Sequence, residues 1–258
     1  MKIIRNLCVA ISLYSRIPMP HFEWEEDDLK HNLVFLPLIG VIIAAVTYGL
    51  MRLNAVICLP DISMIIICSL IPLIITGGFH MDGYMDVQDA VRSYKSAEEK
   101  LKILKDPHIG AFAVIRTIIY VGIWTAALAV VMGTDDMRYA YLYSVTFVIS
   151  RVICGMTSFL FPHAKKEGML DQETREMPKS DIIILVLELM AGCVVAIMLN
   201  PIAGCACLAS AGVFTLYYRH MCMKQFGGVT GDTAGYYISA SEEVMLVVIA
   251  VIRLVISI

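Results

Sequence analysis

Charged residues are scarce in this sequence. Asp, Glu, Lys and Arg make up 17% of the 258 residues, whereas 59% are hydrophobic and the mean hydropathy is +0.75. Soluble domains are typically about half apolar and about one quarter charged, so the composition excludes an ordinary soluble domain. Long apolar runs instead predict an all-α, polytopic helix bundle in a lipid bilayer. The formal net charge of −3 gives no indication of a nucleic-acid partner.

Several common motifs are also missing. The eight cysteines show no zinc-type CxxC spacing and lie mostly in apolar runs, which favours small, buried, reduced side chains. The sequence has no P-loop, no GxGxxG motif and no Ser-His-Asp pattern. No linker or internal repeat divides the chain, so we expect one membrane-embedded domain over residues 1–258.

The N-terminal segment is a poor match to a signal peptide. It begins with basic residues and has an apolar middle, but the apolar stretch is short and no small-x-small cleavage site follows. We expect an amphipathic helix on the membrane surface, which Pro18 and Pro20 terminate.

Seven apolar stretches approach the length of about 20 residues that a membrane-spanning helix requires. They are residues 33–51, 62–79, 110–132, 139–162, 181–199, 202–218 and 243–258. Three substantial loops then lie on the same side as the N-terminus, at residues 80–109, 163–180 and 219–242. That side carries fifteen Lys and Arg residues, and the other side carries only Arg52 and Arg138. The positive-inside rule therefore predicts a cytoplasmic N-terminus, three cytoplasmic loops and an external C-terminus.

Residues 76–90, directly after the second apolar run, carry three regularly spaced carboxylates. Asp82, Asp86 and Asp89 are four and three residues apart. Because a helix turns about 100° per residue, the three fall within an arc of roughly 60°. Like charges this close need compensation, which Mg²⁺ held jointly with substrate phosphates would provide. The alternative is a helix N-cap followed by two solvated carboxylates.

Other polar residues near the predicted spans have both a functional and a structural interpretation. Asp106 and His108 precede the third span and are either catalytic or metal-binding groups or the cap of a helix. Arg151 falls near the middle of the fourth span, where a charge is costly. Arginine can grip phosphate with two hydrogen bonds, but Arg151 could equally pair with an intramembrane acid such as Glu188.

The third cytoplasmic loop contains the glycine-rich segment Gly227-Gly-Val-Thr-Gly-Asp232. Glycines permit tight turns that direct several N–H groups at one point, and such a loop ahead of a helix favours anions. The substrate-binding candidates here are Lys224, Gly227, Gly228, Thr230 and Gly231. Many glycine-rich segments are only turns, but this one is predicted on the same membrane face as the three carboxylates. A carboxylate-held cation beside a phosphate cradle is what phosphoryl transfer needs.

Six segments, taken in order, carry a family resemblance. They are Ser15–Pro20 (SRIPMP), Phe35–Gly40 (FLPLIG), Thr76–Ala90 (TGGFHMDGYMDVQDA), Leu104–Phe112 (LKDPHIGAF), Ser150-Arg151 with Lys166–Met169 (KEGM), and Gly227–Asp232 (GGVTGD) with Glu242. Together they resemble the cobalamin synthase family, the adenosylcobinamide-GDP ribazoletransferases. Phe79 and Tyr84 stand where the family more often has Leu, and Ala113 stands where it has Gly.

The resemblance implies a multi-pass enzyme of the cell membrane that completes the cobalamin nucleotide loop with Mg²⁺. The ribose 3′-hydroxyl of α-ribazole, or of its 5′-phosphate, attacks the corrinoid-side phosphorus of adenosylcobinamide-GDP, and GMP leaves. On this interpretation Asp82, Asp86 and Asp89 hold Mg²⁺ on the diphosphate, and Asp232 is a candidate for a further ligand. Arg151 and the backbone of residues 227–231 bind phosphate oxygens.

The base for the ribose hydroxyl is left open by the residues. It must lie within hydrogen-bond reach of the proton that it accepts. The catalytic candidates are His80, Asp106 and Asp232.

Two alternatives, another membrane transferase and a cation-coupled transporter, fit the sequence less well. CDP-alcohol and aromatic prenyl transferases also place Asp clusters at a cytoplasmic membrane face. Here, however, Asp82-Gly83 continues as Tyr-Met-Asp-Val rather than DGxxAR, and only one dense carboxylate cluster is present. A cation-coupled transporter would place its acids near the middle of the membrane, whereas these acids lie at the ends of spans.

Overall fold

The computed structural model of the protein describes residues 2–20, 26–134, 136–165 and 168–256. Within these ranges the chain forms helices and no strands, which confirms the all-α prediction. The helices are α1 (Lys2–Tyr14), the 3₁₀ helix η1 (Glu26–Leu29), α2 (Asn32–Ile57), α3 (Asp61–Thr76), α4 (Phe79–Arg92), α5 (Ala97–Ile103), α6 (Ala111–Met132), α7 (Arg138–Leu160), α8 (Met169–Glu176), α9 (Lys179–Leu199), α10 (Pro201–Phe226) and α11 (Gly231–Ile256). Residues 21–25, and Lys166 and Glu167 of the family segment KEGM, lie outside the described ranges.

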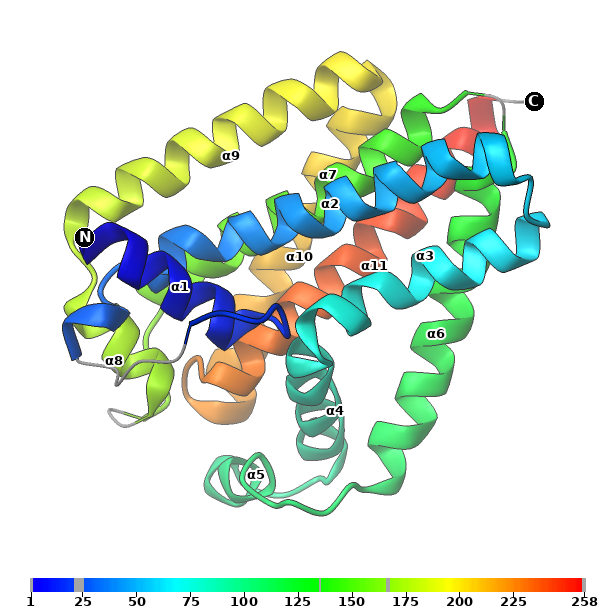
Figure 1. Cartoon of the computed structure of the whole chain (residues 1–258). Helices are drawn as coiled ribbons and strands as arrows, with labels where there is room; N and C mark the ends of the chain where they lie inside the picture. Colours follow the sequence, from blue (N-terminus) through cyan, green and yellow to red (C-terminus); the bar gives the residue numbers. More distant parts are fainter. Residues whose placement is uncertain (1, 21–25, 135, 166–167, 257–258) are drawn as a thin grey trace.

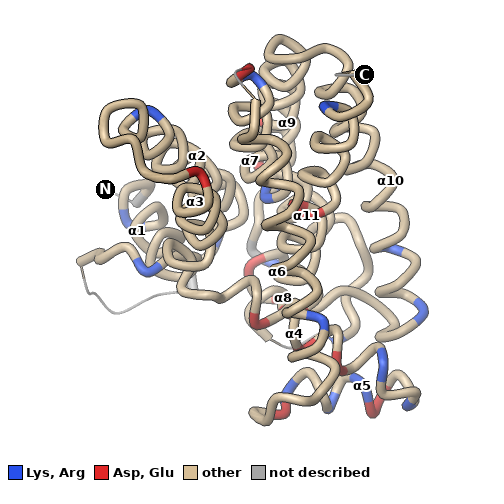
Figure 2. The backbone as a smooth tube through the Cα atoms, turned by 90° about the vertical axis from the view of Figure 1, so that its right-hand side faces the viewer, with Lys and Arg blue, Asp and Glu red and all other residues tan. Residues whose placement is uncertain are grey.

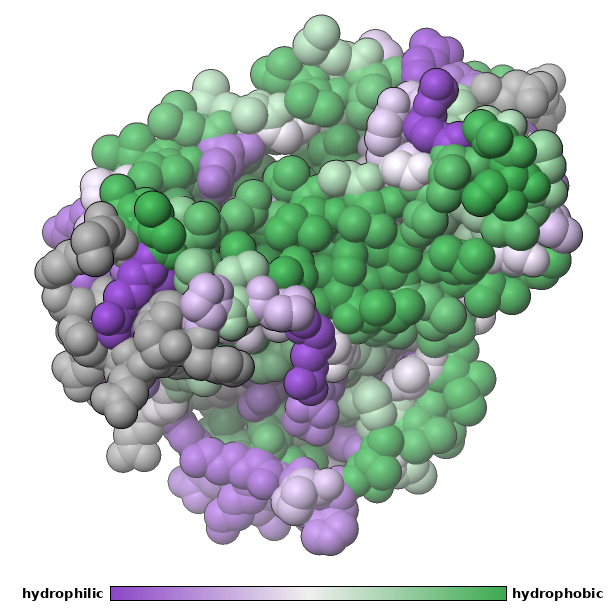
Figure 3. All heavy atoms as spheres, viewed as in Figure 1, coloured by the Kyte–Doolittle hydropathy of each residue, from purple (hydrophilic) through white to green (hydrophobic). Residues whose placement is uncertain are grey.

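The long helices form a bundle, and the short helices gather at one end of it (Figure 1). α1 ends at Tyr14, before Pro18 and Pro20, as expected from the sequence. It packs against α2, and α8 lies near it at the same end. α4 and α5 lie below the bundle, where Lys, Arg, Asp and Glu are concentrated (Figure 2). The visible face over α2 and α3 is broadly apolar, and the edge formed by α5 is hydrophilic (Figure 3).

Five of the described helices are long and apolar enough to cross a membrane, namely α2, α6, α7, α9 and α10. The number is six if the bent pair α3–α4 counts as one span. This confirms a polytopic membrane bundle. α3 alone has 16 residues. The seventh predicted span, 243–258, corresponds to the C-terminal half of α11, apart from residues 257–258, which are not described. α11 is not among the candidate spans. It carries Glu242 and Glu243 near its middle, and it packs against α4, α6, α7 and α10 inside the bundle.

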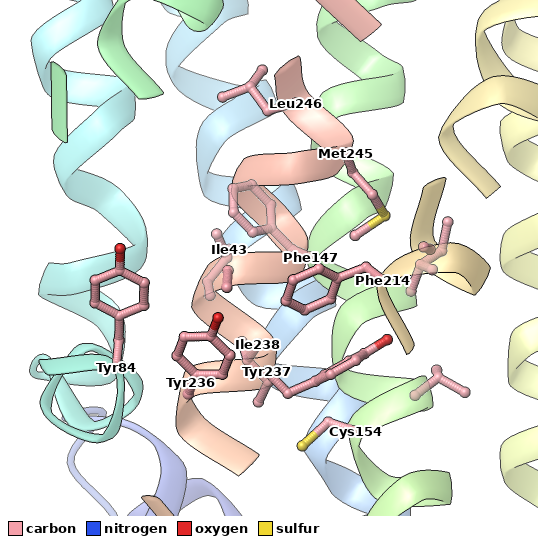
Figure 4. Close-up of a cluster of buried hydrophobic side chains, with 14 of the residues drawn as sticks. Ile43, Tyr84, Phe147, Cys154, Phe214, Tyr236, Tyr237, Ile238, Met245 and Leu246 are labelled. Carbon is pink, nitrogen blue, oxygen red and sulfur yellow. The ribbon is translucent and has the colours of Figure 1, made fainter. Parts of the chain in front are cut away.

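The centre of the bundle is formed by α7 and α11. Tyr237 and Met245 of α11 lie beside Phe147 of α7, and all three side chains are buried (Figure 4). α2 closes on α7 at Gly40, where a Cβ atom would lie only 2.3 Å from the carbonyl oxygen of Phe147. A residue with a side chain at this position would therefore force the two helices apart.

The third predicted loop, 219–242, is much shorter in the structure than the sequence indicated. α10 continues to Phe226 and α11 begins at Gly231, so that only residues 227–230 connect them. The polar residues Arg219, His220 and Lys224 end the apolar stretch at 218, but they do not end the helix. Hydropathy reports where a helix leaves the apolar layer, whereas helix length depends on backbone hydrogen bonding.

Candidate active site

A cavity of about 510 Å³ opens at the charged end of the bundle. Segments far apart in the sequence line it, including α1, α4, α8 and the start of α11. Its polar lining includes His80, Asp82, Lys105, Lys165, Glu173 and Asp232. The predicted carboxylate stretch and the predicted glycine-rich loop therefore meet at one cavity.

The α3–α4 break brings the carboxylates to this cavity. Gly77 and Gly78 have φ angles of +64° and +81°, in the left-handed region that favours glycine. These two residues turn the chain by 93° between α3 and α4. His80 and Asp82 follow directly, in the first turn of α4.

Two further glycines bring α4 against the first turns of α11. A Cβ atom at Gly83 would lie 2.6 Å from the carbonyl oxygen of Asp232. A Cβ atom at Gly235 would lie 3.1 Å from the carbonyl oxygen of His80. The absence of side chains at both positions allows a close helix contact, which places His80, Asp82 and Asp232 around one space.

Asp82, Asp86 and Asp232 repel one another across this helix contact. Partial burial raises the pKa of Asp86 to about 7, and the charges of Asp82, Asp232 and Asp89 add to the effect. Burial, together with Asp82, also raises the pKa of Asp232, although Lys105 and Lys165 partly offset this increase. A site where nearby carboxylates resist ionisation favours a bound cation.

Asp89, the third predicted metal ligand, binds backbone N–H groups at the start of α6. Its carboxylate accepts hydrogen bonds from the N–H of Gly110 (2.7 Å) and of Ala113 (2.9 Å), and so caps the start of α6. Of the three helix-face carboxylates, Asp89 therefore fits the capping interpretation best.

The carboxylates near α11 suit a partly coordinated Mg²⁺. Among the residues that the structure describes, no three His, Cys, Asp or Glu side chains are grouped closely enough to hold a metal by themselves. Mg²⁺ usually takes only one or two carboxylates and completes its coordination with water and substrate phosphates. Asp82, Asp86 and Asp232 supply the hard oxygen donors that such an ion prefers.

His80 lines the cavity with an uncommitted ring nitrogen. Its side chain is 5% exposed, and Nδ1 has no hydrogen-bond partner among the described residues. Burial and the nearby charge of Arg151 hold the pKa of His80 well below its usual range. The imidazole is therefore neutral, and the case for His80 as a base depends on its place at the cavity and on its unpaired Nδ1.

Arg151 does not line this cavity. Its side chain is 1% exposed, and its Nη1 donates hydrogen bonds to Glu242 and to the carbonyl oxygen of Phe147. Ser150 donates a further hydrogen bond to the same Glu242 oxygen, at 2.7 Å. Arg151 thus pairs with an intramembrane acid, as one sequence interpretation expected, but the acid is Glu242 and not Glu188. Glu242 was identified only as part of a family motif.

The glycine-rich segment is a tight connection more than an open cradle. The N–H groups of Gly227, Gly228, Val229 and Thr230 all donate to protein oxygen atoms. A Cβ atom at Gly228 would lie 2.4 Å from the backbone nitrogen of Ala164, so this glycine allows residues 162–164 to pack against the loop. Of the five candidates in this segment, only Thr230 and Gly231 line the cavity.

Asp106 and Lys224 are not brought to the cavity either. Lys224 is exposed on α10. Asp106 is exposed and accepts a hydrogen bond from the N–H of His108 at 3.0 Å, which lowers the pKa of its carboxyl. Lys105 and Lys165 line the cavity instead. Lys105 directly precedes Asp106 in the segment LKDPHIGAF. This segment therefore does contribute a residue to the cavity, although not the residue that was predicted.

A buried hydrogen-bonded group on the cavity wall was not predicted. Glu173 of α8 is 3% exposed and accepts hydrogen bonds from Tyr14 (2.6 Å) and Asn32 (3.3 Å). Burial raises the pKa of Glu173, and these two bonds offset only part of the increase. This role could not be predicted from the sequence, because an acid in a polar segment such as 163–180 normally faces water.

Comparisons with known proteins cover nearly the whole chain. The family described as cobalamin-5-phosphate synthase matches residues 6–250. An adenosylcobinamide-GDP ribazoletransferase of Lachnoclostridium phytofermentans is 34% identical over 243 residues, which cover 94% of this chain and 92% of the relative. Proteins with the same name from Clostridium botulinum (strain Alaska E43) and Clostridium perfringens (strain ATCC 13124) are 33% and 28% identical, over 95% and 98% of this chain and 96% and 100% of theirs. No solved structure matches the chain significantly.

Proposed function

The chain belongs to the cobalamin-5-phosphate synthase family, and we propose from this that it is a membrane-bound adenosylcobinamide-GDP ribazoletransferase. The enzyme transfers the adenosylcobinamide phosphate group from its GDP diester to the 3′-hydroxyl of α-ribazole or of α-ribazole 5′-phosphate. The new bond joins the ribose 3′-oxygen to the corrinoid-side phosphorus. The bond from that phosphorus to the GMP oxygen breaks, and the hydroxyl proton passes to a base.

We assign the active site to the cavity because it is lined by His80, Asp82 and Asp232. One or two of the carboxylates of Asp82, Asp86 and Asp232 would hold Mg²⁺, and oxygen atoms of the diphosphate would complete its coordination. The bound ion would supply positive charge that neutralises the diphosphate and improves GMP as a leaving group. The sequence also predicts Asp89 as a Mg²⁺ ligand. Because Asp89 caps α6, we prefer Asp232 as the third candidate carboxylate beside Asp82 and Asp86.

Four groups on the cavity wall could bind phosphate oxygens. Lys105 and Lys165 supply positive charge, and Thr230 supplies a hydroxyl group. Gly231 begins the 26-residue α11, so that the positive end of the helix dipole faces the same space. This set replaces Arg151 as our proposal for phosphate binding.

Among the three predicted bases, His80 fits the structure best. It is buried, neutral and free at Nδ1. Asp232 also lines the cavity, but it belongs to the carboxylate group that favours a cation. Asp106 is exposed and hydrogen-bonded to its own loop. We therefore propose His80 as the group that accepts the ribose proton.

We propose that the active site faces the cytoplasm of a cell whose plasma membrane holds the bundle. The sequence places fifteen Lys and Arg residues on this side and two on the other. The charged helices α4 and α5 lie at one end, and α11 ends near the other (Figures 1 and 2). The cavity, which Asp82 of α4 lines, opens at the charged end. A reporter fused at residue 134 should therefore prove external, and a cytoplasmic reporter there would reverse this topology.

The function is tested with purified full-length protein in lipid nanodiscs. Adenosylcobinamide-GDP and α-ribazole, or its 5′-phosphate, should yield GMP and the joined cobalamin product, and chelation of Mg²⁺ should stop the reaction. Folded protein that releases no GMP with either nucleophile would refute the proposed transferase. GMP release that is unaffected by chelation would refute only the role of the metal.

A further inference from the structure

A second hollow meets the active-site cavity at Asp82. It is a groove of about 610 Å³ lined by the ends of α1 and α3 and by the first turns of α4. Phe79 and Asp82 line both the groove and the cavity. Asp82 therefore borders two hollows, and the proposed reaction has so far used only the cavity.

Arg16 is the cation on the wall of this groove, within the described part of the chain. Its backbone N–H donates to the carbonyl oxygen of Ile75 at 2.8 Å, which fixes the segment after α1 to the last turn of α3. Its side chain lies over Gly77, where a Cβ atom would lie 2.4 Å from the Cγ and Nε atoms of Arg16. The α3–α4 break thus both directs Asp82 and makes room for this arginine.

The guanidinium group of Arg16 is exposed and uncommitted. Among the described residues it has no hydrogen-bond or ion-pair partner, in contrast to Arg151, which is buried and paired. Arginine matches the geometry of a phosphate group with two parallel N–H donors. An unpaired arginine in a groove that leads to the reacting centre therefore points to a phosphate-bearing ligand.

The positions of the cavity and the groove relative to Asp82 indicate which reaction partner the groove binds. His80, the proposed base, lines the cavity and not the groove. The attacking hydroxyl therefore belongs in the cavity. In displacement at phosphorus the attacking and leaving oxygens are roughly in line, on opposite sides of the phosphorus. With the phosphorus near Asp82, the leaving group points away from the cavity and into the groove.

We propose that the groove binds the departing nucleoside monophosphate and that Arg16 holds its phosphate. This inference rests on the proposed function, and it adds a leaving-group site that is separate from the nucleophile site. Phe79, which is 46% exposed at the junction, offers an aromatic face to the nucleotide. As the bond to phosphorus breaks, negative charge grows on the GMP oxygen, so Arg16 both binds GMP and favours its departure.

The test measures GMP binding with wild-type protein and with Arg16→Gln, both full-length and in nanodiscs. Arg16→Gln should weaken inhibition by GMP about tenfold, which is the loss expected for one charge-assisted phosphate contact. Equilibrium titration with GMP should show the same loss, whereas the affinity for guanosine, which lacks the phosphate, should stay the same. Arg16→Lys, which keeps the charge but not the fork, should fall between wild type and Arg16→Gln.

Lys95→Gln is the matched control, because it removes one positive charge from an exposed position on the same side of the protein. It should leave the affinity for GMP at the wild-type value. A second variant, Ser12→Trp, narrows the groove without changing Arg16 and should also weaken GMP binding. Unchanged melting temperatures establish that the variants are folded.

The outcomes separate this inference from the proposed function. If wild-type protein releases no GMP from adenosylcobinamide-GDP, the proposed function itself fails. If wild-type protein turns over and folded Arg16→Gln binds GMP as tightly as wild type, the groove is not the leaving-group site. The same conclusion follows if Arg16→Gln instead raises the KM for α-ribazole 5′-phosphate at constant GMP affinity, which would place the nucleophile in the groove.

Discussion

Gly83 of α4 faces the backbone of Asp232 at the start of α11 so closely that a Cβ atom would lie 2.6 Å from the Asp232 carbonyl oxygen. Gly83→Ala should therefore displace α4 from α11 and separate the carboxylates. Overpacking of this kind typically costs about 1–3 kcal/mol of stability. The rate of GMP release should fall by more than the loss of folded protein explains, because Asp82 and Asp232 no longer share one cavity. Thermal unfolding in detergent and GMP release measure the two effects.

Gly49→Ala is the matched control for this substitution. A Cβ atom at Gly49 has no neighbouring atom within 4 Å, and Gly49 lies within α2. Alanine there should stabilise the helix by up to about 1 kcal/mol and leave turnover unchanged. Equal effects of the two substitutions would show that the α4–α11 contact is not what positions the site.

Asp86 and Asp89 should respond differently to removal of their charge. Asp86→Asn should lower turnover at least about 100-fold and raise the Mg²⁺ concentration that gives half-maximal activity. Asp89→Asn should mainly lower stability, by about 1 kcal/mol, because Asp89 caps α6 through Gly110 and Ala113. Magnesium titrations and melting curves distinguish the two. Near-normal turnover of well-inserted Asp86→Asn would exclude it as a metal ligand.

His80→Gln should lower kcat by about 100-fold or more, in the range expected when a general base is lost. The KM for α-ribazole should change little, because the proposed role of His80 is to accept the ribose proton and not to bind α-ribazole. His220→Gln is a suitable control, since His220 is exposed on α10. If folded His80→Gln keeps the wild-type kcat, Asp232 becomes the stronger candidate.

Arg151 and Glu242 should behave as one buried pair. Removal of either partner alone leaves a buried charge, at a typical cost of about 3–5 kcal/mol. Arg151→Met combined with Glu242→Leu should recover much of this loss. A double-mutant cycle on unfolding in detergent measures the coupling. Poor stability in both single variants and not in the double variant would support a structural pair. A stable double variant with a greatly raised KM would instead restore the substrate-binding prediction for Arg151.

Glu173 should make stability depend on pH in a defined direction. Its pKa is raised in the folded state, so the folded protein binds the proton more tightly than the unfolded chain does. The free energy of unfolding should therefore fall as pH rises above the ordinary Glu pKa of about 4.3, and the decrease should end above the raised pKa. Glu173→Gln keeps an oxygen acceptor for Tyr14 and should lack this decrease. Melting temperatures between pH 4 and pH 8 that run parallel in both proteins would contradict the prediction.

The sequence predicted the helical class and most helices correctly, because long apolar runs leave few alternatives in a bilayer. It failed where a helix continues into water, as α10 does beyond residue 218. Helical spacing placed Asp82, Asp86 and Asp89 on one face, but it could not show that the backbone of Gly110 and Ala113 comes to Asp89. That contact depends on how the chain folds back after α5.

The predictions for the candidate site were limited because contacts between distant parts of the chain cannot be read from residue spacing. Arg151 was recognised as an unusual charge, yet its partner Glu242 lies 91 residues further along the chain. Lys105 and Glu173 were overlooked because charges in polar loops are usually solvated. The glycines of the 227–231 segment suggested an anion cradle, whereas Gly228 serves to let residues 162–164 pack closely. Residue type and spacing identified the neighbourhood, and tertiary packing decided which members face the cavity.

The shortness of α3 predicts the depth in the bilayer at which the proposed reaction takes place. Sixteen residues of helix measure about 24 Å, less than the ~30 Å of a typical hydrocarbon core. If α3 starts at one face of the hydrocarbon core, the chain turns at Gly77 before it reaches the other face, and we expect Asp82 to lie level with the headgroups. Turnover should therefore respond to bilayer thickness, with thinner lipids matching α3 and thicker lipids straining the turn that carries the carboxylates.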